Sequence, residues 1–122
     1  MNIQDVIYDR FGQPQIFLTN TGRFIDFSGI DLGFLQNGNV YNYGGNYVGW
    51  YENGVLRDKY GNVVGFGENP TDYPTPFLPI RAMRPAFPMV GTPPMKPMTF
   101  IPAIHFMKTF NWSTIDPIGL FN

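Results

Sequence analysis

The chain has 122 residues, the size of one domain, and its eight basic and nine acidic residues leave a net charge of −1. This balance excludes a global positive field that would attract nucleic acid or anionic lipid. The absence of cysteine excludes disulfides, thiolate metal sites and a cysteine nucleophile, and a single histidine, His105, excludes a multi-histidine metal cage.

Composition divides the chain into two regions near residue 68. Residues 1–67 hold 12 of the 14 glycines, whereas residues 70–122 hold 11 of the 12 prolines and five of the six methionines. An aromatic content of 17% is too high for a disordered chain, and so much glycine and proline is untypical of a helical one. We therefore expect an all-β domain over residues 1–68, followed by an extended Pro/Met/Phe-rich arm over residues 69–122.

The first region contains four repeats of about 16 residues. In each repeat, Asp or Asn is followed three residues later by glycine, a pattern typical of a type I turn capped by the acidic or amide side chain. These turn residues are Asp9 and Gly12, Asp26 and Gly29, Asn42 and Gly45, and Asp58 and Gly61. Further glycines, Gly22, Gly38 and Gly54, close the units, and the Asn before the last two favours type I′ hairpin turns. Each unit is thus predicted to form two short strands.

Two columns of apolar residues accompany these turns and are the expected core. The residues before the turns are Ile7, Phe24, Val40 and Leu56, and the aromatic residues after them are Phe17, Phe34, Trp50 and Phe66. Leu32, Val48 and Val64 stand two positions before the last three aromatics, so strand alternation predicts that each pair shares a face. Glycine directly precedes these aromatics, which indicates close approach of a neighbouring backbone or ring. Four such units together can bury a face that one cannot.

These repeats resemble the bacterial family of four-fold β-flower proteins. The resemblance is carried by Tyr8–Gly12, Val40–Trp50 and, most specifically, Gly54–Phe66, with Asn111-Trp112-Ser113 after the Pro-rich segment. It implies a pseudo-four-fold arrangement of β-hairpins with an extended tail, and no established activity. The first unit departs from the pattern at Ile16 and Pro14, so we expect it to be an edge or an irregular unit. The YD repeats of secreted toxins and the choline-binding repeats share parts of the pattern, but they usually form long arrays on secreted chains.

The arm is expected to be extended and packed. Its three Pro-x-x-Pro steps, Pro76–Pro79, Pro85–Pro88 and Pro94–Pro97, suit polyproline II. Its many large apolar side chains would each forfeit ~1.5–3 kcal/mol in water. We therefore expect the arm to lie across the repeats or across a neighbouring subunit. Only residues 104–109 are compatible with a regular helix.

Three more specific interpretations compete with simple packing. Residues 76–81 match the P-x-x-P-x-[RK] form that SH3 domains bind. Outward tyrosines could stack on sugar rings, and the turn residues Asp9, Asp26, Asn42 and Asp58 could ring a calcium or magnesium ion. Turn capping already explains that last set, and packing explains most of the others. The surface available for interaction is predicted to include Tyr43, Tyr47, Tyr51, Pro76, Pro79, Arg81 and Trp112.

No catalytic residue, metal site or cofactor is predicted. His105 has no serine or cysteine partner at a suggestive spacing, and no phosphate-binding motif is present. The sequence therefore predicts a non-enzymatic, homo-oligomeric self-assembly module. The Pro-rich arm could also bind an unknown protein partner. A small-ligand module, tested first with glycans, is the alternative, and an enzyme is third. We expect no nucleic-acid partner and no membrane insertion, and the lack of a signal peptide or membrane span favours the cytoplasm.

Overall fold

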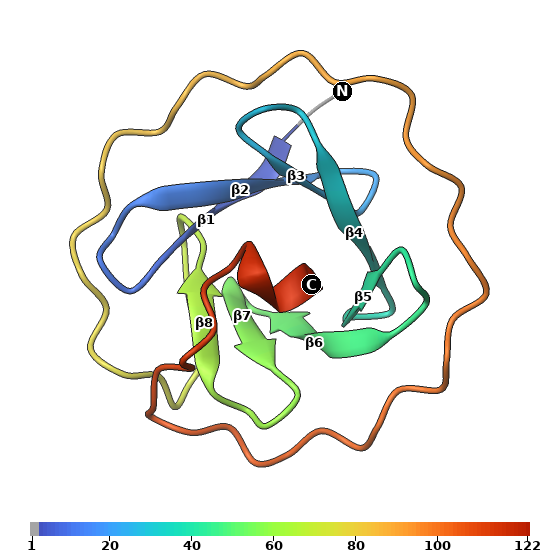
Figure 1. The fold of residues 1–122 in the computed structure, drawn as a ribbon. Helices are drawn as coiled ribbons and strands as arrows, with labels where there is room; N and C mark the ends of the chain where they lie inside the picture. The colour runs from blue at the N-terminus through green and yellow to red at the C-terminus, as the bar shows by residue number, and fades with distance from the viewer. Residues whose placement is uncertain (1–2) are drawn as a thin grey trace.

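A computed structural model describes residues 3–122, and its first region is a closed, eight-stranded antiparallel barrel (Figure 1). The strands are β1 (Ile3–Tyr8), β2 (Pro14–Thr19), β3 (Arg23–Asp26), β4 (Asp31–Gln36), β5 (Asn39–Asn42), β6 (Tyr47–Glu52), β7 (Val55–Asp58) and β8 (Val63–Phe66). Each strand pairs with the next, and β8 returns to β1. The fold is therefore all-β, and the four hairpins predicted from the repeats are arranged in a ring.

Both predicted turn types form at the repeat glycines. In the unit that joins β5 to β6, Gly45 has φ +82° and its N–H donates to the Asn42 carbonyl at 3.1 Å. The Asn42 side-chain oxygen accepts the N–H groups of Gly44 and Asn46, and the three aspartates cap their turns in the same way. At the opposite ends of the hairpins, Asn37 and Asn53 have φ 54° and 51° before glycines with φ 81°. Positive φ at both central residues is the signature of a type I′ turn.

A β-bulge in each unit changes which side chains face the barrel interior. On β4, the register jumps from Gly33 to Asp31, so Leu32 has no partner on β3. Leu32, and its equivalents Val48 and Val64, pack on the interior, whereas the following aromatics lie on the outer face. The prediction that each pair shares a face is wrong, because the extra bulge residue interrupts the alternation.

The barrel interior is filled by the first apolar column and by the end of the chain. Ile7, Phe24, Val40 and Leu56 form one buried cluster with Leu120 and Phe121. We call residues 112–122, which include the short 3₁₀ helix η1 (Gly119–Phe121), the plug. It lies near the centre of the ring of strands in Figure 1. A Cβ on Gly33 would lie 2.5 Å from the Phe121 ring, which explains the predicted close approach at this glycine column.

The first unit is irregular, one of the two alternatives that its sequence predicts, and it is not an edge, because β1 pairs with β8 in the closed barrel. Besides the bulge between Ile7 and Tyr8 that the other units share, a further register shift occurs between Ile3 and Asp5, and a single pair, Tyr8 with Phe66, joins β1 to β8. The Asp5 carboxylate supports this seam by accepting the Glu68 N–H at 2.9 Å and the Tyr51 hydroxyl. The barrel therefore closes through side chains as much as through strand pairing.

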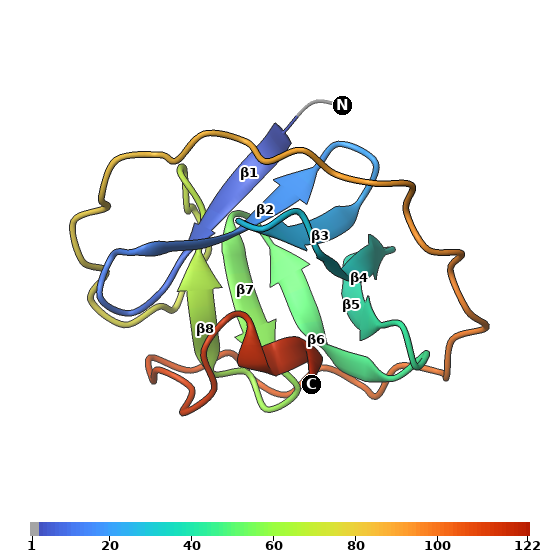
Figure 2. The ribbon, with the colours of Figure 1, turned by 45° about the horizontal axis from the view of Figure 1, so that its top comes forward.

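Residues 69–111, which we call the strap, encircle the barrel without regular secondary structure (Figures 1 and 2). Residues 104–109 are extended, so the helix allowed there by the sequence does not form. His105 stacks on Trp50 of the barrel, and the Met107 carbonyl lies against Gly61. Holding both groups against the barrel requires an extended path, which explains why tertiary contacts override the local helix preference.

Candidate interaction surface

The strap is attached to the barrel at four equivalent glycines. The carbonyls of Ile80, Met89, Met98 and Met107, each nine residues apart, lie against Gly12, Gly29, Gly45 and Gly61. A Cβ on any of these glycines would come closer than 3.0 Å to the strap carbonyl, a distance that real side chains essentially never show. The strap also donates back to three of the glycine carbonyls, from Ala82 at 2.8 Å, Phe100 at 2.9 Å and Thr109 at 3.2 Å. Each nine-residue step along the strap thus spans the distance between two equivalent turn glycines, which are about 16 residues apart in the barrel sequence.

A second nine-residue column of the strap covers the outward aromatics of the barrel. Leu78 and Phe87 pack on the cluster that contains Phe17 and Phe66. The Lys96 ammonium lies 5.5 Å from the centre of the Phe34 ring, and His105 stacks on Trp50 with ring centres 4.1 Å apart. The aromatic column is therefore buried between the barrel wall and the strap.

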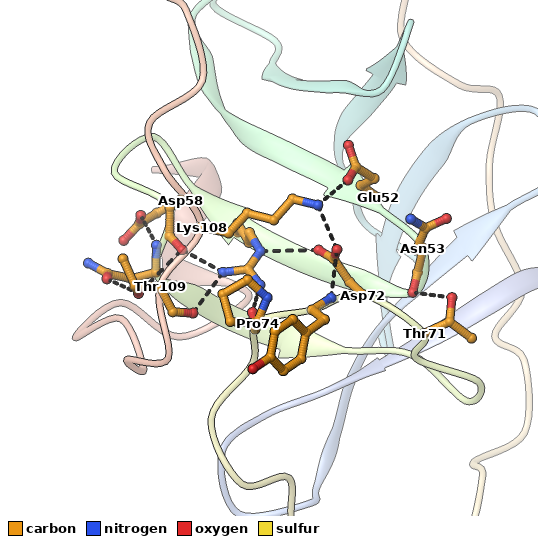
Figure 3. Close-up of polar contacts among 12 residues, drawn as sticks. Glu52, Asn53, Asp58, Thr71, Asp72, Pro74, Lys108 and Thr109 are labelled. Carbon is orange, nitrogen blue, oxygen red and sulfur yellow. Dashed lines mark hydrogen bonds and ion pairs between the residues drawn. The ribbon is translucent and has the colours of Figure 1, made fainter.

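The two ends of the strap meet at a buried arginine (Figure 3). The Arg57 side chain is fully buried, and its Nε lies 3.3 Å from Asp72 Oδ2. Arg57 also donates to the Pro74 carbonyl at the start of the strap and to the Thr109 carbonyl, 3.1 Å away, at its end. One guanidinium group therefore holds both ends of the strap against β7 and satisfies the carbonyls that face it.

Lys108 ties the strap ends directly to each other. Its ammonium donates to Asp72 Oδ1 at 2.6 Å and to the Glu52 carboxylate of β6. Hydrogen bonds to Asp72 and then to Glu52 raise the pKa of Lys108. We call Glu52, Arg57, Asp72 and Lys108 the clasp, because they close the strap into a ring.

The outward side of the strap carries a row of apolar side chains at every third position, the period of polyproline II. We call this row the outer stripe; it consists of Phe77, Ile80, Met83, Ala86, Met89, Thr92, Met95, Met98, Ile101, Ile104, Met107 and Phe110. Nine of these side chains are between 87% and 96% exposed. Ala86 and Thr92 weaken the row in one quarter of the ring, whereas residues 95–110 form its densest part. So much exposed apolar surface is rare on a monomer.

The strap and the barrel carry opposite net charges. The strap has four basic residues and one acidic residue, and residues 3–68 have four basic and seven acidic residues. The strap therefore carries +3 and the barrel −3, and Asp116 of the plug gives the overall charge of −1. The apolar outer stripe lies on a positively charged ring around a negatively charged body.

The predicted surface tyrosines are engaged within the fold. The Tyr43 hydroxyl donates to Asp31 at 2.6 Å and accepts from Arg23 at 2.5 Å, and burial together with the Asp31 hydrogen bond raises the pKa of Tyr43. The Tyr51 hydroxyl donates to Asp5. Burial raises the pKa of Tyr47 to about 12, and its hydroxyl has no hydrogen-bond partner among the described residues. The hydroxyl groups of Tyr43 and Tyr51 are therefore engaged by partners within the fold.

The other predicted surface residues also face the barrel. Pro76 and Pro79 are half-buried, and the Arg81 guanidinium lies 5.8 Å from the Tyr8 ring centre while it donates to the Glu68 carbonyl. Trp112 packs against Phe66, with ring centres 6.3 Å apart. Within residues 3–122, no group of three or more histidine or acidic side chains is placed to hold a metal ion.

The sequence analysis missed the clasp, the strap ring and the outer stripe. Two signals for the strap were available, because the Pro-x-x-Pro steps begin nine residues apart and the Met, Ile and Phe residues recur every third position. The clasp left no such signal. Arg57 lies 15 residues from Asp72 and 52 from Thr109, and only the closed barrel brings them together.

Comparison with known proteins identifies the family to which the chain belongs. Over residues 3–122, no helix is long and apolar enough to cross a membrane. No curated protein and no solved structure matches the chain. A family model described as "4-fold beta flower protein" matches residues 5–120, which include most of β1, all of β2 to β8 and the whole strap. The chain therefore belongs to the 4-fold β-flower family.

Proposed function

We propose that this protein is a non-enzymatic self-assembly module, and that the outer stripe of one copy binds further copies of the same chain. The observation that carries the proposal is the exposure of nine large apolar side chains in one continuous row. At ~1.5–3 kcal/mol for each large side chain left in water, such a row strongly favours association.

The size of the stripe suits several small protein contacts. At ~25 cal/mol per Å², these transfer energies correspond to roughly 60–120 Å² of apolar surface per side chain. The whole row then offers on the order of 800 Å², as much as one partner contributes to a single standard interface. Because the row runs around the molecule, a single neighbour covers only one sector, and each contact is smaller than a standard interface. We therefore expect growth beyond a dimer through side-by-side contacts.

The overall charge is compatible with a second copy as the partner. A net charge of −1 gives little mutual repulsion between copies. A lipid bilayer suits the strap less well. An extended strap makes no backbone hydrogen bonds within itself, so burial in hydrocarbon would leave N–H and C=O groups unsatisfied.

Sedimentation velocity over a range of protein concentrations tests the proposal. We expect the mass of the native chain to increase with concentration. The triple substitution Met98→Gln, Ile101→Gln and Ile104→Gln, in the densest part of the stripe, should shift the chain to monomer. The matched control, Ala86→Gln, Met89→Gln and Thr92→Gln, has the same spacing in the weakest part and should keep most of the association.

Two results would refute the proposal. One is a native chain that stays monomeric at every concentration. The other is a native chain that sediments with vesicles of mixed neutral and anionic lipid, and loses that binding in the Met98/Ile101/Ile104 variant, without self-association in their absence. Cooperative thermal unfolding of both triple variants confirms that the comparison concerns the surface and not the fold.

A further inference from the structure

Methionine is confined to one surface of the described molecule. Residues 3–82 contain none, and the five methionines between residues 83 and 122 all belong to the outer stripe. They are Met83, Met89, Met95, Met98 and Met107, and each is 87–96% exposed. The barrel core uses Val, Leu, Ile and aromatic residues instead. The thioether groups are thus concentrated where they contact solvent and absent where they would contact the core.

The backbone of three of these methionines is held against the barrel while their side chains are free. The carbonyls of Met89, Met98 and Met107 lie against Gly29, Gly45 and Gly61. Their side chains point away from these contacts, as their exposure shows. A chemical change at the sulfur atoms therefore leaves the attachment of the strap intact.

We infer that the five stripe methionines are a modification site, and that their oxidation by peroxide switches off the association proposed above. This inference rests on the proposed function, because it concerns the control of the same surface. In each reaction the thioether sulfur attacks a peroxide oxygen, the O–O bond breaks and a sulfur–oxygen bond forms. Sulfur loses two electrons to give the sulfoxide, and hydrogen peroxide is reduced to water.

The sulfoxide changes the surface in the direction that opposes association. Methionine sulfoxide is polar and hydrogen-bonding, so it disrupts methionine-rich interfaces. Of the large apolar residues in the stripe, only the pairs Phe77 and Ile80, and Ile101 and Ile104, then remain adjacent, since the methionines are distributed from Met83 to Met107. Association and oxidation also compete for the same side chains, because a methionine buried against another copy is inaccessible to peroxide.

Peroxide treatment of the full chain, followed by sedimentation velocity, tests the inference. Peptide mass spectrometry should find one added oxygen atom on each of the five stripe methionines. We expect the concentration for half-association to rise at least about tenfold, which corresponds to about 1.4 kcal/mol of association free energy. Treatment with methionine sulfoxide reductases of both stereospecificities and a dithiol should restore the original concentration dependence.

Two variants separate this inference from the proposed function. Replacing all five stripe methionines with leucine keeps the row apolar, so this variant should associate and no longer respond to peroxide. Replacing all five with glutamine imitates the polar state, so this variant should be monomeric without peroxide. Both should unfold at a temperature close to that of the native chain.

The possible failures differ from each other. If the untreated chain does not associate at all, the proposed function fails and the inference fails with it. If the untreated chain associates and the oxidised chain does so equally, only the inference is overturned. Loss of the barrel's circular-dichroism signal on oxidation would also overturn it, because the methionines would then support the fold.

Discussion

The barrel and the strap are both periodic, but they use the period for opposite purposes. The barrel repeats every 16 residues, and each repeat adds an apolar residue to a closed interior. The strap repeats every nine residues for its inward contacts and every three for its exposed row. Burial defines one region and exposure defines the other. The comparison teaches that apolar content alone does not identify a core, because the strap is as rich in large apolar side chains as the barrel.

If the barrel is stable alone, the strap and plug are not needed for its fold. Removing both is therefore the most severe test of how the two regions depend on each other. We expect a chain ending at Asn69 to be unfolded or aggregated. It lacks Leu120 and Phe121 from the interior and Leu78 and Phe87 from the outer aromatic column, at ~1.5–3 kcal/mol for each large side chain. Such losses match the entire stability of a domain this small. Circular dichroism during heating checks the result, and a cooperative transition near that of the full chain would contradict it.

The clasp joins the two regions, and Arg57→Met should cost about 3–5 kcal/mol. The change removes one of the two cations paired with the buried Asp72 carboxylate, and it removes the donor of the Gly61, Pro74 and Thr109 carbonyls. Urea unfolding measures this loss. Adding Asp72→Leu to the same chain should recover part of it, since an apolar side chain then replaces the buried carboxylate that lost its arginine. Lys59→Met removes a nearby exposed charge and should change the stability by less than about 0.5 kcal/mol. Equal effects of Arg57→Met and Lys59→Met would show that the clasp is not a point of attachment.

The glycine contacts allow the attachment of the strap to be measured separately from backbone strain. Gly45 and Gly38 have nearly the same φ, +82° and +81°, but only Gly45 lies against a strap carbonyl. Gly38→Ala should therefore cost about 1–2 kcal/mol for the left-handed conformation alone. Gly45→Ala should cost about 1–3 kcal/mol more, because the strap must shift. Gly91→Ala, at a strap position with open space, is the control and should be near neutral. Equal losses of stability at positions 38 and 45 would mean that the strap moves away from residue 45 at little cost in free energy.

The smallest expected effect concerns the barrel surface beneath the strap at high pH. Burial raises the pKa of Tyr47 to about 12, above its ordinary value of about 10. The contribution of Tyr47 to stability is therefore complete below pH 10 and is lost as the pH rises towards 12, at up to about 1.4 kcal/mol per pH unit. Tyr47→Phe should flatten this decline while it leaves the stability at pH 7 equal or higher, since the hydroxyl has no partner. Unfolding in urea at pH 7, 10 and 11 makes the comparison, and an unchanged decline would place Tyr47 in contact with water.

Most of the barrel could be predicted because its signals are local. Each Asp or Asn with its glycine defines a turn within four residues, and each Asn-Gly defines a hairpin turn within two. The bulges at Leu32, Val48 and Val64 could not be predicted in the same way. They depend on the pairing register of the adjacent strand, and they moved the aromatic column from the expected interior to the outer face.

The strap could be predicted only in part, because its structure is determined by the barrel. Its extended form followed from the prolines, and its packing followed from its apolar residues. The side on which each residue lies follows from where the four turn glycines are placed in space. His105 illustrates the limit, since its neighbours Ile104 and Met107 are almost fully exposed while its ring stacks on Trp50. The local sequence, which is compatible with a helix over residues 104–109, does not reveal that division.

The position of the plug has a consequence for how the chain matures during synthesis. Phe66 ends the last strand, whereas Leu120 and Phe121 fill the barrel that the strands form. At ~5–20 residues per second, the intervening 55 residues take roughly 3–11 seconds to translate. Throughout that interval the nascent chain carries eight strand segments without the residues that complete their core. Such a chain reaches its final fold only after residue 121 has left the ribosome, and until then its incomplete core is exposed to aggregation.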